Sequence, residues 1–228
     1  FIPSKSNMKI AAFIYGAGDR IKAGSYSIPN GVSYLDMIDL LTEGVPKEQK
    51  LVTIQEGIWQ PELAGLLQKK LGLDSTKIMQ LSEDKNFIRS LGLQVDNIEG
   101  YLLPDTYYFF TDSKANEILR RLKNEMTLLF DETTEKQMEK LGMTQHEILT
   151  MASIIEAESN VQSEFATIAG VYYNRLELGM RLQADPTVQY LIRHRKRNNR
   201  ILYKDLEIES PYNTYKNRGL PPSPINNP

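Results

Sequence analysis

The sequence contains no cysteine, and this absence removes several kinds of chemistry at once. Disulfide bonds, zinc sites built from thiolates and cysteine nucleophiles are all excluded. Histidine is scarce too, because the chain has only two. The HEIL stretch at His146 lacks the second histidine of a metalloprotease helix, and a Ser-His-Asp triad would have no local motif around it. We therefore expect neither a metal centre nor a cofactor.

Other signals are also missing. The chain has no GxxxxGK[ST] or GxGxxG phosphate loop and no GxSxG elbow. A net charge of -2 gives no general attraction to nucleic acid. No apolar run approaches the ~20 residues that cross a bilayer, and no signal peptide is present. Because the chain starts abruptly at Phe1 and ends in PPSPINNP, we expect a piece cut at both ends, with an anchor outside it.

What is present describes an ordinary folded chain. Its 41% hydrophobic and 25% charged residues, in 228, suffice for one large domain or two small ones with a proper core. Short strand signals among many helical patterns predict an α+β fold. We expect a small βα module followed by a mixed, helix-rich α+β domain, with the boundary near residue 95.

The first third contains an internal near-repeat. SIPNGVSYLDMIDLLTEG from position 27 aligns with TIQEGIWQPELAGLLQKKLG from position 53. Each copy is typical of a short β segment, a glycine turn and an amphipathic helix, which ends at Gly44 or Gly72. Ser33 is expected to cap the first helix, and Pro61 suits the first turn of the second. Two copies are too few for a solenoid, so a small βα module is predicted.

Helical patterns dominate the rest of the chain. They cover the stretches 74–93, 115–137, 144 onward and 164–178. Thr144 and Glu147 form a capping-box signature, and Asp185 is expected to cap a further helix with Pro186 in its first position. DNIEGYLLPDTYYFF predicts a turn and a strand. Five of the 11 prolines lie in the last 18 residues, so we expect polyproline-like backbone laid against the domain there.

Two carboxylates, Glu156 and Glu158, interrupt the otherwise apolar or small stretch MASIIEAESN. Helical periodicity places them on opposite edges of an apolar face. That face is predicted to consist of Ile148, Met151, Ala152 and Ile155. A carboxyl group on such an edge loses hydration, so its pKa rises and it can donate a proton to a glycosidic oxygen. Periodicity alone does not distinguish this acid from a carboxylate that reaches water or pairs with Arg175.

A cluster of polar side chains follows Gly179. It includes Gln183, Asp185, Thr187 and Gln189, and then Asn213, Thr214 and Tyr215 of PYNTY. Amide, hydroxyl and aromatic groups on loops suit a sugar-binding cleft, although a helix cap and a turn would use the same residues. The basic run RHRKRNNR, residues 193–200, is typical of a solvated loop or of a contact with an anionic polymer or lipid.

Several of these blocks occur together in one known family. ASIIEAES, VYYNRLELGMRLQADPTVQY, SPYNTY and GLPPSPINNP, with EGYLLPDTYYF, KAGSYSIPNGVS and TIQEG upstream, resemble the endolytic murein transglycosylases of bacterial cell walls. The resemblance implies a membrane anchor, a LysM-like module and a catalytic domain. We expect residues 1–95 to be the LysM-like module with linking helices, and residues 96–228 to be the catalytic domain without its C-terminal part.

The resemblance also implies a reaction. Glu156 is the acid of the family's ASIIE pattern, so it becomes the catalytic residue in preference to Glu158. It would cleave the MurNAc–GlcNAc β-1,4 bond within glycan strands and leave a 1,6-anhydroMurNAc end. The expected sugar-binding residues are Gln183, Asp185, Thr187, Asn213, Thr214 and Tyr215. Implied partners are the glycan-polymerising synthases, at the outer face of the cytoplasmic membrane, where a single-pass anchor would hold the enzyme to terminate or trim nascent strands.

Two alternatives stay open at this point. A muramidase would use water, with Glu158 or Asp185 as its second carboxylate, and would leave reducing ends. A non-catalytic glycan-binding or scaffold protein would place its affinity in the near-repeat, around Gly31, Gly57 or Trp59. Trp59, the only tryptophan, could stack on a sugar or belong to a core.

Overall fold

The computed structural model describes residues 5–22, 26, 33–44, 48–195 and 200–228. The chain divides into two compact units, residues 1–48 and 49–228. The smaller unit contains α1 (Lys5–Ile14) and α2 (Tyr34–Glu43). Ser33 caps α2 as predicted, because its side chain accepts from the Asp36 amide. Residues 23–25 and 27–32 between these helices, with Gly31 of the first copy of the near-repeat, lie outside the described residues.

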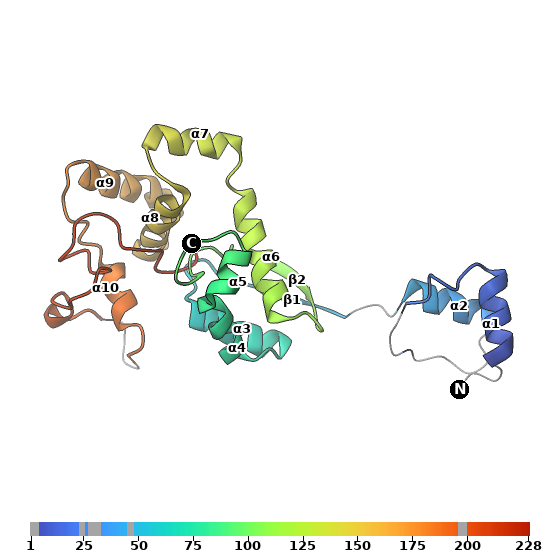
Figure 1. Cartoon of the computed structure of the whole chain (residues 1–228). Helices are drawn as coiled ribbons and strands as arrows, with labels where there is room; N and C mark the ends of the chain where they lie inside the picture. Colours follow the sequence, from blue (N-terminus) through green and yellow to red (C-terminus); the bar gives the residue numbers. More distant parts are fainter. Residues whose placement is uncertain (1–4, 23–25, 27–32, 45–47, 196–199) are drawn as a thin grey trace. The chain divides into compact units, whose positions relative to one another are not determined.

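The larger unit begins with one lobe, which we call the sheet lobe (residues 49–128). Its elements in chain order are β1 (Gln49–Thr53), α3 (Gln60–Leu71), α4 (Ser75–Glu83), α5 (Lys85–Ser90), β2 (Thr106–Phe110) and α6 (Ala115–Leu128). The strands pair antiparallel, with Val52 opposite Tyr107 (Figure 1). Pro61 lies in the first turn of α3, and Gly72 ends it in the left-handed conformation, both as predicted.

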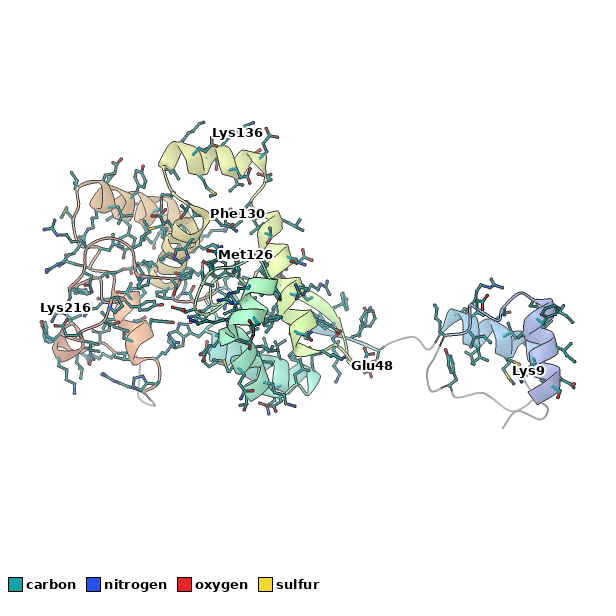
Figure 2. All side chains as sticks on the ribbon, in the orientation of Figure 1. Lys9, Glu48, Met126, Phe130, Lys136 and Lys216 are labelled. Carbon is teal, nitrogen blue, oxygen red and sulfur yellow. The ribbon has the colours of Figure 1, made fainter. Side chains whose placement is uncertain are left out.

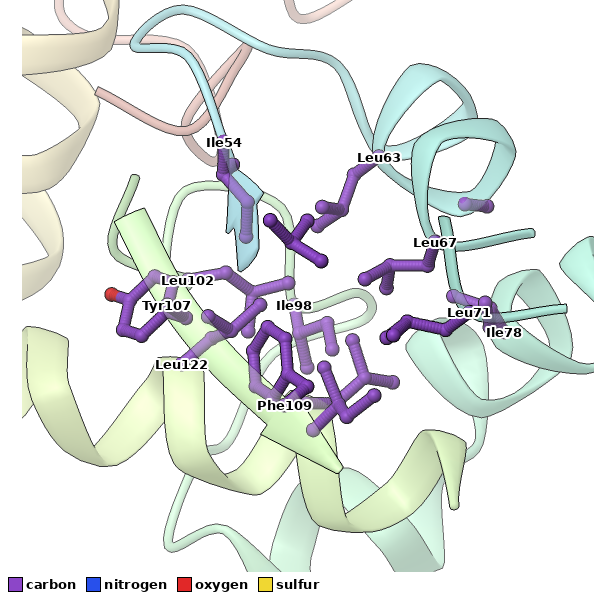
Figure 3. Packing of buried hydrophobic residues seen from close by; sticks show 14 of the residues in the cluster. Ile54, Leu63, Leu67, Leu71, Ile78, Ile98, Leu102, Tyr107, Phe109 and Leu122 are labelled. Atoms are coloured by element: carbon purple, nitrogen blue, oxygen red, sulfur yellow. The ribbon is translucent and has the colours of Figure 1, made fainter. Parts of the chain in front are cut away.

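The core of the sheet lobe lies where β1 and β2 face α3, α4 and α6 (Figure 3). Tyr107 and Phe109 point inward from β2, while Tyr108 is exposed, as the period of two in a strand requires. This core continues without interruption from Val52 to Leu122. The boundary expected near residue 95 therefore lies inside one packed core, and the division into two compact units falls between residues 48 and 49. A LysM-like module stays a prediction.

The second lobe, which we call the helical lobe (residues 129–228), is built around α8. Its helices are α7 (Glu132–Leu141), α8 (Gln145–Glu158), α9 (Phe165–Glu177) and α10 (Asp185–Ile192). Met151 and Ile154 of α8 pack with Tyr172 of α9, Tyr190 of α10 and Ile225 near the end of the chain. Thr144 and Glu147 close the capping box that starts α8, as predicted. Helices in both lobes around a two-stranded sheet confirm the α+β class.

Two expected helices are each divided in the structure. The stretch 74–93 is two helices, because Asp84 caps the second one through the Phe87 amide. The stretch 115–137 is also two helices, because Asp131 caps α7 through the Thr134 amide. The link between them holds Phe130, which packs with Met126 of α6 (Figure 2). An internal aspartate can start a new helix within a continuous apolar pattern, and the pattern does not show this.

The buried face of α8 also differs from the predicted one. The buried residues are Leu149, Thr150, Met151, Ser153 and Ile154, whereas Ala152 and Ile155 are only partly buried. The reason is the C-terminal segment, residues 221–228, which lies against α8. Ser153 is fully buried because its Oγ accepts from the Ile225 amide at 3.0 Å and its carbonyl accepts from the Asn226 side chain at 2.9 Å. The polar Ser153 is thus buried against protein, on a face of α8 that its hydrophobic pattern predicts to face solvent.

The same segment joins the two lobes of the larger unit. Asn227 exchanges backbone hydrogen bonds with the β1–α3 loop, from Gly57 N–H to its carbonyl at 2.8 Å and from its own N–H to Ile58 at 3.1 Å. Its side-chain oxygen accepts from the amides of Gly100 and Leu102. The last residues do lie against the domain as predicted, since most of the segment 221–228 is buried and the chain end lies between the lobes (Figure 1). The polyproline-like backbone expected over the last 18 residues is wrong, because turns and bends fill this stretch.

A buried ion pair adds a second connection between the lobes. Arg193, just after α10, lies 3.7 Å from the carboxylate of Glu99, which also accepts from the Gln60 amide at 2.8 Å. Arg195 pairs with the buried Asp205 at 2.7 Å. Two cations of the basic run are thus engaged with buried carboxylates, and positions 196–199 lie outside the described residues. The run is in part a structural element of the fold.

We predict that Gly100→Ala destabilises the larger unit by about 3 kcal/mol or more. Gly100 has φ +86°, and a methyl group there would lie 2.1 Å from Cβ of Pro224, an overlap that must displace the C-terminal segment. The matched control is Gly142→Ala, where φ is +63° but the space is open, so only about 1 kcal/mol should be lost. Urea unfolding followed by Trp59 fluorescence measures both. Equal losses would contradict the packing role of the segment.

Candidate functional site

Glu156 lies in the last turn of α8, partly buried, with its side chain against the β1–α3 loop. A methyl group added to Gly57 would lie 3.6 Å from Cγ of Glu156 and 4.0 Å from Oε1, so the loop backbone borders the carboxyl group directly. Burial raises the pKa of the Glu156 carboxyl, and the nearby negative charge of Glu56 raises this pKa further. Both effects favour the protonated form of Glu156 over its carboxylate.

The loop that borders Glu156 is held in a fixed geometry. Gly57 has φ +74°, a conformation that suits glycine, and its N–H donates to the Asn227 carbonyl. The preceding residue, Glu56, is exposed. Trp59 is partly buried and precedes α3, with its amide bound to the Glu62 side chain. The strand-side half of the site thus consists of a backbone turn and one free carboxylate.

A second group of polar side chains surrounds Glu158, on the opposite side of the last turn of α8. The Tyr172 hydroxyl donates to Glu158 at 3.1 Å, and the Tyr215 hydroxyl donates to Asp185 at 2.5 Å. Burial and the Asp185 carboxylate raise the pKa of Tyr215 to about 12, and the charge of Glu158 contributes to this shift. The Tyr215 hydroxyl therefore keeps its proton and remains a hydrogen-bond donor.

Gln183 and Asp185 belong to the same group. Arg175 of α9 donates to the Leu182 carbonyl at 2.6 Å and approaches the Gln183 side chain at 3.4 Å. Gln183 is the one non-glycine residue with positive φ, 53°, among those described. Asp185 is the first residue of α10 and not its cap, which is Ala184. Its exposed carboxylate is therefore available to Tyr215 and to solvent.

The other three predicted binding residues are buried. Thr187 and Thr214 join their hydroxyl groups at 2.9 Å, and the Asn213 amide donates to the carbonyls of Leu206 and Ile208. Their bonds to protein groups fix the PYNTY segment against α10. Their contribution to the site is therefore the placement of Tyr215.

The structure brings some of the predicted residues together and separates others. Gln183, Asp185 and Tyr215 lie close to one another and within electrostatic range of Glu158. Glu156 instead faces Glu56 and Gly57. The site therefore has two sides, one on each flank of the last turn of α8.

Sequence reasoning missed Glu56 and Asn227 as members of the site. Both are remote from Glu156 in the chain, and neither belongs to a local pattern with it. TIQEG and GLPPSPINNP do contain them, so the resemblance marked the segments without their roles. Only the packing of the two lobes brings Glu56 near Glu156 and lets Asn227 bind the loop that borders it.

The described residues were also compared with what a metal site and a membrane-spanning helix require. Within the described ranges, no group of three or more His, Cys, Asp or Glu side chains is arranged to hold a metal ion. None of the helices described is both long enough and apolar enough to span a bilayer.

Comparison with known proteins gives consistent relatives. An endolytic murein transglycosylase of Bacillus subtilis (strain 168) is 34% identical over 227 residues, which cover 93% of this chain and 62% of that protein. One from Streptococcus pneumoniae (strain R6) is 30% identical over 240 residues, 91% of this chain and 43% of that protein. The chain thus spans less than two thirds of the length of either relative.

A solved structure agrees with these relatives. The crystal structure of a YceG-like protein from Listeria monocytogenes superposes with a TM-score of 0.70 at 31% sequence identity, covering 99% of this chain and 78% of that one. The YceG-like family itself matches residues 1–228. This chain belongs to the YceG-like family.

Proposed function

We propose that this chain is the glycan-cleaving part of an endolytic murein transglycosylase, a lyase that acts on peptidoglycan. The observation that carries the proposal is the environment of Glu156, a half-buried carboxyl group whose pKa is raised by burial and by Glu56. Two relatives that bear this name support the choice of substrate. A proton donor of this kind is what cleavage of a glycosidic bond requires.

In the proposed reaction, Glu156 protonates the oxygen that links MurNAc to GlcNAc. The bond to the MurNAc anomeric carbon breaks, and the electron pair leaves with the protonated GlcNAc oxygen. The Glu156 carboxylate then takes the proton from the C6 hydroxyl of the same MurNAc. The C6 oxygen bonds to the anomeric carbon, so a 1,6-anhydroMurNAc end forms and Glu156 regains its proton.

A single carboxyl group is sufficient for this route because the nucleophile belongs to the substrate. Glycosidases that use water need a second carboxylate to activate it or to form an intermediate. A hydroxyl group on the same sugar is presented at a high effective concentration instead.

Positioning of the strand falls to the other flank of α8. We assign direct sugar contact to Gln183, Asp185 and Tyr215, whose polar groups are exposed or partly exposed. A donor hydroxyl, a carboxylate and an amide can bind sugar hydroxyl and acetamido groups. The buried Thr187, Asn213 and Thr214 hold these side chains in place. A glycan that crosses the end of α8 would meet both flanks.

The setting of the reaction follows from the same proposal. Its substrate lies in the cell wall, so we place the protein outside the cytoplasm, at the outer face of the cytoplasmic membrane. A single-pass anchor beyond this chain, a LysM-like module and glycan-polymerising synthases as partners complete the proposal, in which cleavage terminates or trims nascent strands. Each of these rests on the resemblance.

A muramidase is the second candidate, and one observation favours it. Glu56 supplies a carboxylate beside Glu156, which is the pairing that hydrolysis needs. In that case a water molecule would attack the anomeric carbon, and the new MurNAc end would be reducing. Mass spectrometry of the products separates the two candidates, since anhydro ends belong only to the lyase.

We expect Glu156→Gln to lower the rate of strand cleavage by about 10²–10⁴-fold, because the amide has no acidic proton to give. The measurement is digestion of purified glycan strands, with the new ends identified by mass spectrometry. Glu83→Gln, which removes an exposed carboxylate of α4, is the control and should leave the rate unchanged. Equal rates for wild type and Glu156→Gln would exclude Glu156 as the acid and would favour a non-catalytic glycan-binding protein.

The rate should also depend on pH in a defined direction. Glu156 must be protonated to act, so the rate should fall as pH rises through its elevated pKa. Glu56→Gln removes one of the causes of that elevation, so this fall should move to lower pH. The readout is the pH profile of kcat/KM, again with Glu83→Gln as control. If kcat/KM fell at the same pH in Glu56→Gln as in wild type, Glu56 would not be a cause of the raised pKa of Glu156.

A further inference from the structure

A cavity of about 860 Å³ lies at the other end of α8 from Glu156. It is lined by α5 and the loop after it, by the start of α8, and by Tyr212 and Ser223. Its volume is in the range of sites that hold small organic ligands. Neither Glu156 nor the Gln183–Tyr215 group lines it, so the proposed cleavage chemistry does not account for it. We call it the α5–α8 cavity.

Several polar side chains of this cavity have no partner in the protein. In the part of the chain that the structure describes, Arg89, Gln94 and Gln145 form no side-chain hydrogen bond and no ion pair. Arg89 and Gln94 are exposed and Gln145 is partly buried. Lys85 on the same rim is 3.4 Å from Asp96, an exposed pair that contributes little. The cavity therefore offers one unpaired guanidinium and two free primary amides.

One wall of the cavity is rigid and aromatic. Nε2 of His146 lies 2.8 Å from the Pro222 carbonyl, which can only accept, and the other ring nitrogen bonds to the Tyr101 hydroxyl. Burial raises the pKa of Tyr101 to about 12, so its hydroxyl keeps its proton. Both nitrogens of His146 are thus occupied by the protein. Recognition of a ligand falls to Arg89 and the amides, with the Tyr101 and Tyr212 rings as apolar surface.

This combination of groups matches a short acidic peptide. Primary amides pair with peptide groups through one donor and one acceptor each. A guanidinium binds a carboxylate with two parallel hydrogen bonds. The amino end of α8 is not the anion site, because Glu147 already occupies it through the capping box. The charged part of the ligand therefore belongs at Arg89.

We propose that the α5–α8 cavity binds the peptide branch of the murein strand, with a branch carboxylate on Arg89 and branch amides on Gln94 and Gln145. The proposal rests on the proposed function, because it assumes that the strand is the substrate. It adds a second recognition site, through which the enzyme would prefer strands that still carry their peptides. The glycan itself would bind elsewhere, across the end of α8.

The distances along α8 are compatible with this arrangement. His146 and Glu156 are ten residues apart, which is about 15 Å along a helix. A peptide of five residues in extended form spans about 17 Å, so a branch on a sugar near Glu156 reaches the cavity. Leu149, which lies on the same face of α8 as Glu156 seven residues later, packs with the cavity residue Tyr101. The cavity and Glu156 lie toward the two ends of this helix.

Binding of two soluble probes to the whole chain tests the proposal. The probes are N-acetylmuramyl pentapeptide and N-acetylmuramic acid, which has a carboxylate but no peptide; neither has a glycosidic bond to cut. We expect the pentapeptide to bind at least about tenfold more tightly and to shift the NMR signals of the Gln94 and Gln145 side-chain amides. Arg89→Gln should weaken its binding about tenfold, the loss of a charged hydrogen-bond pair.

The control variant is Lys77→Gln, which removes one positive charge from an exposed position on α4 in the same lobe and should bind like wild type. Equal affinity for both probes, no binding of the pentapeptide, or equal affinity in Arg89→Gln and wild type would overturn the proposal. Arg89 is exposed, so urea unfolding should give the same stability for Arg89→Gln and wild type.

Cleavage assays keep this proposal separate from the proposed function. Wild type should cut peptide-bearing strands faster than stripped strands, and Arg89→Gln should lose that preference while it still cuts stripped strands. If both kinds of strand were cleaved at the same rate, the proposed peptide site would be contradicted, and the proposed lyase activity would not. If the protein bound the pentapeptide but cleaved neither kind of strand, the proposed lyase activity would be contradicted, and the proposed peptide site would not.

Discussion

The hydrogen bonds of Asn227 are the constraint on which the candidate site depends. Through its backbone this residue fixes the β1–α3 loop, and through its side chain it fixes the turn at Gly100. Its neighbours Ile225 and Asn226 bind Ser153 in the middle of α8. One short segment thus sets the position of the helix that carries the acid relative to the loop that borders it.

The acidity of Glu156 follows from that placement. The carboxyl group is partly withdrawn from water because the Gly57 turn lies against it, and burial is the main cause of its raised pKa. The Glu56 charge acts in the same direction and comes from the same loop. If the two lobes separated, both effects would weaken together. The fold therefore couples the protonation of Glu156 to the contact between the lobes.

The ion pair of Glu99 and Arg193 has a related role at the other flank. It joins the sheet lobe to the end of α10, the helix whose first residue is Asp185. Burial raises the pKa of Glu99, while the Gln60 amide and Arg193 oppose that rise. A buried pair of this kind is weak evidence for net stability, but removal of one partner is costly. Its clear effect is to restrict where α10, and with it Asp185 and Tyr215, can lie.

Local features of the fold were accessible from the sequence. Caps at Ser33 and Thr144, Pro61 in a first turn and the strand after Pro104 all depend on neighbours within a few residues. The α+β class followed from the same patterns. Breaks at Asp84 and Asp131 were missed, because a capping aspartate is compatible with a continuous helical pattern until the tertiary structure selects the break.

Tertiary structure alone decided the rest. Hydrophobic periodicity assigned the wrong face of α8 to the interior, because the covering segment is polar and bonds to Ser153. Glu56 comes near Glu156, and Asn227 binds the loop that borders it, only when residues about 70 to 170 apart in the chain pack together. The sequence by itself determined which carboxyl group is proposed as the acid, through the family resemblance around ASIIE. The environment that gives this group its proton is made by contacts between distant segments, and no local pattern encodes these.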